Sequence, residues 1–334
     1  MKRAACLAFL AIVTLITASI PVATANSNLI QSGVTSNFPS PIVYSHVMDD
    51  NSLLMVQGDG LIISATIENG KISELWSHDI GYNVTFGKLD YGEKLLALIH
   101  EGGFLTFNLE AKQSEFITPL SDAPDSLDWD SDGHIWIAYH DGLRKAREYY
   151  EGSYNGYQTS TITSGFFSFE VLSNDYLAVG GFDNKLHIFD DAGALMIQLN
   201  QPESYISALY EPHEGTLLAG SGDGVLHNYD YNSSWDYSSI SLGADQITSI
   251  QDFSNTHYAV IDSGNNIHFI DKLSFTKTGE LPSVSTVQFV IAELTGQISV
   301  VYNTGQSSGV MYYDLDYDGD GVIDSMDDFP NEPT

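Results

Sequence analysis

The sequence has little positive charge. It contains 12 Lys and Arg against 44 Asp and Glu, a formal net charge of -32, and no basic residue follows Lys277. Contacts with nucleic-acid phosphates and with anionic lipid headgroups both need clustered Lys and Arg. We therefore expect no nucleic-acid partner and no docking on an anionic membrane. An acidic surface is common where salt screens self-repulsion, which favours a saline habitat.

Cysteine and long apolar runs are also scarce. Cys6 is the only cysteine, and it lies in the one long apolar run, Ala4 to Ile16. Lys2 and Arg3 precede this run and Ala23-Thr24-Ala25 follows it. This order is typical of a secretory signal peptide with an A-x-A cleavage site, although a membrane anchor is the alternative. We expect residues 1–25 to be a signal peptide. The mature protein is then secreted or held at the cell surface, with no disulfide and no membrane span.

A unit of about forty residues recurs along the chain. Each unit reads as an apolar strand, a turn, a second apolar strand, a tight turn of Asp, Gly or Asn, a third apolar strand and a polar strand. The first apolar residues after the tight turn are spaced by 43, 39, 43, 40, 41 and 43 residues, and they are Leu61, Phe104, Leu143, Leu186, Leu226, Ile267 and Val310. Repeats of this length with four short strands each are typical of a β-propeller.

The tight turns and the strands before them fix the expected elements. The turn pairs tolerate positive φ at both central hairpin positions, and they are Asp59-Gly60, Gly102-Gly103, Asp141-Gly142, Asp183-Asn184, Asp223-Gly224 and Asn265-Asn266. Apolar strands are expected at Leu53–Val56, Leu95–Ile99, Ile135–Tyr139, Tyr176–Val179, Thr216–Ala219, Tyr258–Ile261 and Ile298–Tyr302. The prediction is an all-β fold over residues 26–314: a seven-bladed β-propeller of four-stranded antiparallel blades.

The last unit lacks a fourth strand downstream, because the chain turns acidic after Asp314. A propeller must close its ring or leave an unpaired edge. Residues Asn28 to Val34 precede the first unit and have no other partner. We therefore predict that they complete the last blade. The alternative is a frayed N-terminus.

Several third strands end in an apolar or aromatic residue followed by Asp. The pairs are Phe189-Asp190, Tyr229-Asp230, Ile270-Asp271 and Tyr313-Asp314. They stand where WD repeats carry Trp-Asp, so the chain resembles WD-repeat and quinoprotein-like propellers. The segment Trp129 to Leu143 also resembles a blade of the two-component-regulator propellers. The sialidase Ser-x-Asp-x-Gly-x-Thr-Trp box and the Trp-bearing repeat of quinone-cofactor dehydrogenases are both absent from the sequence.

The C-terminus carries the pattern of a calcium loop. Seven Asp lie between residues 314 and 328 with no basic residue nearby. Read as a twelve-residue loop, the pattern places Asp at positions 1, 3, 5, 9 and 12, Gly321 at the sharp turn and a backbone carbonyl at position 7. The expected ligands are Asp316, Asp318, Asp320, Val322 through its carbonyl, Asp324 and Asp327. Calcium is thus the one expected cofactor, and a solvated acidic tail is the alternative.

The same run, continued through Phe329-Pro330, resembles a thrombospondin type 3 calcium repeat more than a helix-flanked EF-hand, although the loop itself is EF-hand-like. That family stacks several such loops, whereas residues 315–334 hold one. The resemblance implies a calcium-binding tail after the propeller, or the remnant of a longer array.

The only basic cluster precedes a group of tyrosines spaced by glycine. Aromatic rings on such a loop, with arginines beside them, can stack on a sugar or a peptide. The candidate ligand-binding residues are Arg144, Arg147, Tyr149, Tyr150, Tyr154 and Tyr157. The alternative is an ordinary outer hairpin of the third blade.

Three histidines recur at 40 and 41 residues, His187, His227 and His268, each one residue after the first apolar position of a third strand. In a propeller this places them at one radius on successive blades. They form either part of a metal or ligand ring or, as we favour, polar packing copied with the repeat.

No P-loop or dinucleotide motif occurs, and we assign no catalytic residue. The preferred interpretation is a monomeric secreted propeller that binds an extracellular protein or glycan. The alternative is a secreted propeller enzyme, such as a lyase, a hydrolase or a quinone-type oxidoreductase, with its site at the central channel.

Overall fold

A computed structural model describes residues 29–68, 71–120, 124–139, 142–150, 153–160, 166–281, 286–292, 298–303 and 308–315. Every helix or strand in these residues is a β-strand, β1 to β28. Within the same ranges, no helix has the length and hydrophobicity of a membrane span. The predicted signal peptide and the calcium loop lie outside the described residues.

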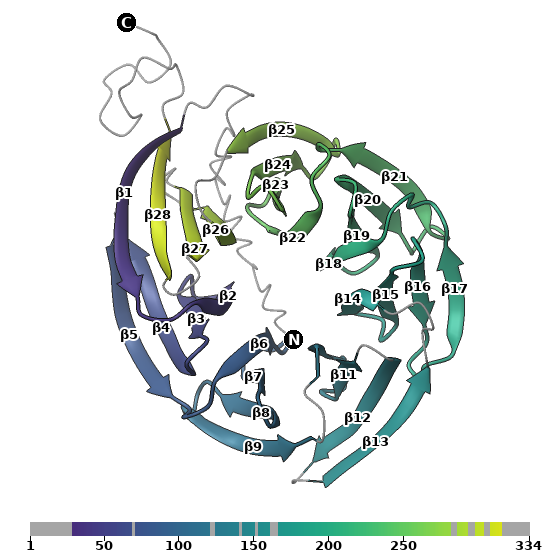
Figure 1. The fold of residues 1–334 in the computed structure, drawn as a ribbon, viewed down its shortest axis with the longest axis horizontal. Coiled ribbons are helices and arrows are strands. Elements are labelled where there is room, and N and C mark those ends of the chain that lie inside the picture. Colours follow the sequence, from purple (N-terminus) through teal and green to yellow (C-terminus); the bar gives the residue numbers. More distant parts are fainter. Residues whose placement is uncertain are drawn as a thin grey trace, which may run out of the picture.

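The strands form four-stranded antiparallel sheets arranged around a centre, so the fold is a β-propeller and each sheet is a blade (Figure 1). Five blades are simple meanders with most side chains described. They are β2 (Ile42–Val47), β3 (Leu53–Gln57), β4 (Leu61–Glu68) and β5 (Lys71–Asp79); β6 (Val84–Leu89), β7 (Leu95–His100), β8 (Gly103–Asn108) and β9 (Gln113–Pro119); β14 (Phe166–Val171), β15 (Leu177–Gly181), β16 (Leu186–Phe189) and β17 (Leu195–Leu199); β18 (Ile206–His213), β19 (Thr216–Ser221), β20 (Val225–Asp230) and β21 (Asp236–Ser241); and β22 (Ile247–Asp252), β23 (His257–Asp262), β24 (Ile267–Asp271) and β25 (Thr276–Leu281).

Two further four-stranded sheets have the same pairing pattern, but many of their side chains lie outside the described residues. One holds β10 (Ser126–Trp129), β11 (Ile135–Tyr139), β12 (Gly142–Tyr150) and β13 (Ser153–Ser160). The other holds β26 (Thr286–Ala292), β27 (Ile298–Asn303), β28 (Ser308–Leu315) and β1 (Leu29–Phe38). The prediction of an all-β propeller with four-stranded antiparallel blades is therefore confirmed. The structure shows five blades with most of their side chains described, whereas the sequence predicted seven blades.

Strand β1 comes from the start of the chain and pairs with β28 near its end. The two strands are antiparallel, with Leu29 opposite Leu315 and Val34 opposite Met311. The prediction that residues from Asn28 to Val34 supply the missing fourth strand is confirmed over the described residues, and the strand continues to Phe38. Without β1, the strand β28 would present an unpaired edge.

The tight turns between second and third strands that the structure describes in full use one residue with positive φ, not the two that the sequence predicts. In the first of them only Gly60 is in this region, at 94°, and its amide donates to the Gln57 carbonyl at 2.9 Å. A Cβ on Gly60 would lie 2.2 Å from the Tyr82 carbonyl oxygen, so glycine is required there. Asn184, Gly224 and Asn265 occupy the same region in later turns. A turn with a single left-handed residue satisfies the same hairpin.

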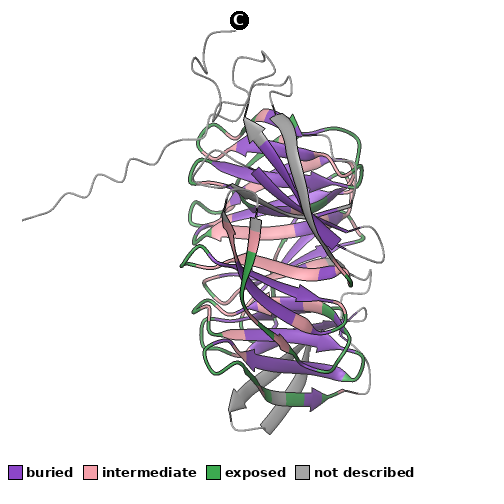
Figure 2. Cartoon of the chain, turned by 90° about the vertical axis from the view of Figure 1, so that its left-hand side faces the viewer, coloured by how far each residue is buried: buried purple, intermediate pink, exposed green. Residues whose placement is uncertain are grey.

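The core lies between neighbouring blades. The second strand of each blade is buried on both faces, because another blade packs on either side (Figure 2). One cluster, for example, joins Leu54 and Val56 of β3 to Leu96 and Leu98 of β7. This explains why the second strands read as continuous apolar runs instead of alternating ones. The first strands β6, β14, β18 and β22 face the centre of the ring (Figure 1).

Candidate functional site

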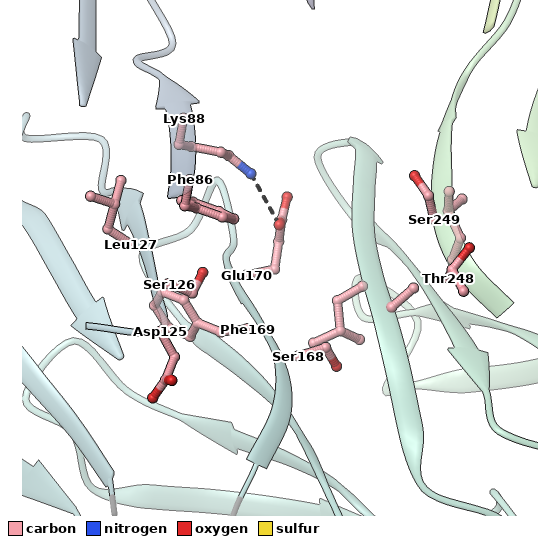
Figure 3. Close-up of a pocket in the computed structure, with 13 residues that line it drawn as sticks. Phe86, Lys88, Asp125, Ser126, Leu127, Ser168, Phe169, Glu170, Thr248 and Ser249 are labelled. Atoms are coloured by element: carbon pink, nitrogen blue, oxygen red, sulfur yellow. Dashed lines mark hydrogen bonds and ion pairs between the residues drawn. The ribbon is translucent and has the colours of Figure 1, made fainter. Parts of the chain in front are cut away.

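A cavity of about 300 Å³ lies among the inner strands near the centre of the ring. Five successive first strands, or the residue just before one of them, contribute to its wall (Figure 3). The lining residues are Phe86 and Lys88 of β6; Asp125, Ser126 and Leu127 at β10; Ser168, Phe169 and Glu170 of β14; Ala208 and Leu209 of β18; and Thr248, Ser249 and Ile250 of β22. The volume is at the lower end of ligand pockets, which span about 300–1,000 Å³.

The cavity wall mixes apolar rings with hydroxyl groups. Phe86 and Phe169 supply rings, and Ser126 and Ser249 supply hydroxyls. The Ser168 hydroxyl donates to the Ile206 carbonyl at 3.1 Å, which leaves its lone pairs to accept a hydrogen bond. Apolar walls with a few fixed polar groups are the usual construction of a small-ligand site.

Three ionisable side chains from successive blades meet beside this cavity, and two of them, Lys88 and Glu170, line it. The Lys88 ammonium lies 3.1 Å from Glu170 Oε2 and 3.3 Å from Asp128 Oδ2. The Asp128 side chain is 4% exposed and that of Glu170 is 12% exposed, whereas Lys88 keeps 31% of its surface. We call these three residues the channel trio. One ammonium serves two carboxylates, so the trio carries a net charge of -1 when all three are ionised.

The two carboxylates of the trio are held differently. Asp128 Oδ1 accepts from the Trp129 amide at 2.8 Å, and its Oδ2 accepts from the Val171 amide at 2.9 Å. Glu170 has Lys88 as its one hydrogen-bond partner among the described residues, through Oε2. Asp128 is therefore a structural carboxylate, which joins two blades. Glu170 is the carboxylate of the trio that can respond to a ligand.

Burial sets the electrostatics of the trio. It raises the pKa of Glu170 to about 7, against the opposing effect of Lys88 and with a further increase from Asp128. Burial also raises the pKa of Asp128. Burial alone would lower the pKa of Lys88, but the two carboxylates outweigh it and raise that pKa. Lys88 thus stays charged at neutral pH, while Glu170 takes up a proton more readily than an ordinary glutamate.

Two tyrosines border the trio and stay neutral. Burial raises the pKa of Tyr44 and of Tyr91, and the nearby carboxylates Asp128 and Glu170 raise that of Tyr91 further. The Tyr91 hydroxyl donates to the Val171 carbonyl at 3.0 Å. Neither tyrosine adds a charge to the cavity.

The channel trio was missed by the sequence analysis, although the chain carries a signal for it. Its members are 40 and 42 residues apart, close to the repeat length. Lys88, Asp128 and Glu170 occupy one register position, opposite a second-strand residue of each blade, respectively Ala97, Trp136 and Ala178. A search of the sequence for ionisable residues at the same position of successive innermost strands would have identified the channel trio.

Carboxylates also connect the turns of neighbouring blades near the trio. Glu93 accepts from the Asp49 amide at 2.8 Å. Asp175 accepts from the Ser131 amide at 2.8 Å, and the Glu211 carboxylate accepts from the Ser173 hydroxyl at 2.8 Å. Each of these bonds joins one blade to the next. They hold the inner strands in place around the cavity.

The predicted Arg and Tyr site lies on the hairpin β12–β13, which forms the two outer strands of its sheet (Figure 1). Cα partners in the hairpin include Arg144 with Gln158, Arg147 with Asn155 and Tyr150 with Ser153. The backbone of this segment therefore forms an outer hairpin of its blade, as the alternative in the sequence analysis stated. The side chains of the six predicted residues, Arg144, Arg147, Tyr149, Tyr150, Tyr154 and Tyr157, lie outside the described part of the structure.

The three repeated histidines each bind a partner within their own blade. His187 Nε2 lies 3.1 Å from Asp183 Oδ1, and His268 Nε2 lies 2.9 Å from Asp262 Oδ2. His227 Nδ1 lies 3.0 Å from the Tyr237 hydroxyl, and burial lowers the pKa of His227 to about 4. Among the described residues, no three His, Cys, Asp or Glu side chains group as metal ligands. The favoured interpretation, polar packing, accounts for these contacts.

Comparison with known proteins agrees with this architecture. No protein-family model and no curated protein sequence matches the chain. Among solved structures, the WD40 β-propeller domain of Doa1 is similar with a TM-score of 0.63 at 13% identity, covering 85% of this chain and 96% of that one. A chain of the mitotic checkpoint complex is similar with a TM-score of 0.63 at 15% identity, covering 92% and 98%. At these identities the likeness shows the fold, and the chain has a β-propeller fold with WD40-like structural neighbours.

Proposed function

We propose that this chain is an exported, non-enzymatic β-propeller that binds an extracellular glycan or protein in its central cavity. The observation that carries the proposal is the cavity itself, which five successive inner strands build and which Lys88 and Glu170 of the channel trio line. Propellers commonly present ligand sites at the central channel. The mixture of hydroxyls, rings and one adjustable carboxylate favours the polar end of a glycan over a flat protein surface.

The proposal includes a ring of seven blades. Its support is the pairing of two further four-stranded sheets beyond the five fully described blades, and the pairing of β1 with β28. The seven recurring units in the sequence support the same number. A closed ring gives the cavity a complete wall.

A secreted enzyme with its site at the same cavity is the second candidate. One observation favours it: the pKa of Glu170, about 7, is suited to general acid–base work at neutral pH. We prefer binding because Glu170 is ion-paired with Lys88.

A glycan array tests the proposed function. We expect the purified chain to retain a defined set of glycans, and Ser249→Trp to abolish retention because an indole fills much of a cavity of about 300 Å³. The matched control is Ser241→Trp, on the outer strand β21. A second variant, Arg147→Ala with Tyr149→Ala, tests the β12–β13 hairpin. Loss of binding in the hairpin variant alone would move the site there, and turnover of a retained glycan would favour the enzyme.

We further propose that residues 1–25 are removed on export and that the mature chain begins at Asn26. The charged start, the apolar run and the A-x-A site support this proposal. N-terminal sequencing of the secreted protein tests it. A sequence that begins at Met1 would contradict it.

We also propose that the C-terminal loop binds calcium through Asp316, Asp318, Asp320, Val322, Asp324 and Asp327. A single loop lacks the support of a paired site, so we expect a dissociation constant of about 10⁻⁴–10⁻³ M, as in extracellular modules. Calcium should protect the tail from proteolysis and leave the blades unchanged. Calorimetric titration should show heat for the wild type and for the control Asp132→Ala, but not for Asp320→Ala. Equal heats in all three would exclude the site.

A further inference from the structure

We propose that the central cavity selects a ligand with a primary ammonium group, of which an amino sugar at the end of a glycan is the form that the cavity fits best. This inference rests on the proposed function and names the chemistry of its ligand. The contact atom assigned to the ammonium group is the Glu170 carboxylate oxygen that does not bind Lys88.

The first argument is charge. The channel trio holds one positive and two negative side chains, and all three lie within 3.3 Å of a partner. Lys88 is shared between two carboxylates, so the trio has one positive charge for two negative charges. A ligand ammonium supplies the second positive charge and makes the trio neutral when Glu170 is ionised. An anionic ligand would instead compete with Asp128 and Glu170 for Lys88, and a neutral ligand would leave the imbalance unchanged.

The second argument is geometry. Asp128 is occupied by two backbone amides in addition to Lys88. Glu170 uses Oε2 for Lys88, and its side chain lines the cavity (Figure 3). Its other oxygen can therefore accept from a ligand placed in the cavity. The Ser168 hydroxyl lines another part of the same cavity (Figure 3) and already donates to Ile206, so toward a ligand it can act only as an acceptor.

The third argument is the remaining wall. Phe86 and Phe169 make part of the wall apolar, as the ring of a sugar requires, and Ser126, Thr248 and Ser249 add hydroxyl-bearing residues to the same wall. The side chain of a lysine is a thin apolar stem with no hydroxyl. A peptide lysine would use the carboxylate but leave these hydroxyls without a ligand partner, which is why we favour the amino sugar.

Ligand binding should depend on pH through Glu170. Its carboxyl group is most affected by burial, then by Lys88 of β6, Asp128 of β10 and Glu211 of β18. The phenols of Tyr91 and Tyr210 also face the group, and the pKa of each is raised, so both stay neutral. Protonation of Glu170 below pH 7 removes the charge that an ammonium group would pair with.

Calorimetric titration of the full chain with single sugars tests the inference. At pH 7.0 we expect glucosamine to bind at least tenfold more tightly than glucose or N-acetylglucosamine. Glu170→Gln should reduce the preference for glucosamine to less than threefold, whereas the exposed Glu110→Gln should keep it. At pH 5.5 glucosamine should bind the wild type more weakly, although the sugar is then more fully protonated. Nα-Acetyl-lysine amide should bind more weakly than glucosamine.

Each contrary result has a definite meaning. Equal binding of glucosamine and N-acetylglucosamine, or an unchanged preference in Glu170→Gln, would overturn the inference and leave the proposed glycan function standing. Tighter binding of the lysine amide would overturn the amino-sugar assignment. Binding of no single sugar, together with an empty glycan array, would overturn the proposed function itself. Glu170→Gln replaces a carboxyl by a neutral group of the same shape, and its circular-dichroism spectrum should match the wild type.

Discussion

Replacement of Lys88 by methionine is expected to lower the free energy of unfolding by about 3 kcal/mol at pH 7, because it leaves two buried carboxylates without their cation. Asp128 and Glu170 are 4% and 12% exposed, and both lie within 3.3 Å of the lysine ammonium. Methionine keeps most of the apolar stem, so the loss reports the charge and not the packing. Urea denaturation followed by tryptophan fluorescence measures it.

Two further variants make this result specific. Lys94→Met removes an exposed lysine that has no ion pair in the described structure, so it should change stability by less than about 0.5 kcal/mol. The double variant Lys88→Met with Glu170→Gln should recover part of the loss, because only one carboxylate is then unpaired. A loss below about 1 kcal/mol for Lys88→Met would mean that the trio is too solvated to organise the cavity.

The second large effect is the pH dependence of stability in Glu170→Gln. The folded-state pKa of Glu170, about 7, lies above its usual value of 4.5. Its contribution to stability is therefore fully present below pH 4.5 and is lost as the pH rises through 7. Because one pKa unit corresponds to about 1.4 kcal/mol, the loss amounts to about 3 kcal/mol. Glutamine does not titrate, so Glu170→Gln should match the wild type near pH 4.5 and exceed its stability by up to this amount above pH 7.

When the stability of Glu170→Gln is compared with that of the wild type at each pH, the contributions of the other titrating groups cancel. Burial lowers the pKa of His227 to about 4, so its contribution is lost as the pH falls from 6.5 through 4. The wild type and Glu170→Gln both lose this stability at low pH. The difference between their free energies of unfolding therefore reports Glu170 alone. The exposed Glu110→Gln is the matched surface control for this comparison. A flat difference for Glu170→Gln would show that this carboxyl is ionised and solvated like a surface group.

The regular elements could be predicted because each leaves a strong local signal. The strand expected at Ile135–Tyr139 is β11 with the same bounds, and the strand expected at Leu53–Val56 is β3 with one further residue. Turn residues such as Gly60 mark the hairpins, since only glycine fits there. Closure by β1 followed from counting strands, because the last unit had no fourth strand downstream.

The site could not be predicted in the same way, because it depends on the register of the inner strands. Glu211 and Asp252 follow Glu170 at 41-residue intervals and look like further members of the trio. The strand pairing instead places Tyr210 and Gln251 at the register position of Glu170. A shift of one residue sends a side chain to the other face of a strand. The spacing alone does not show which of two adjacent residues meets Lys88.

A crystal structure of the chain with a glycan that the array identifies tests the central claim most directly. We expect the end of the glycan to occupy the cavity between β6 and β14, with an ammonium or hydroxyl group against Glu170 and a sugar ring beside Phe86 or Phe169. A glycan bound on the β12–β13 hairpin with the central cavity free of it would contradict the claim that the inner strands form the binding site.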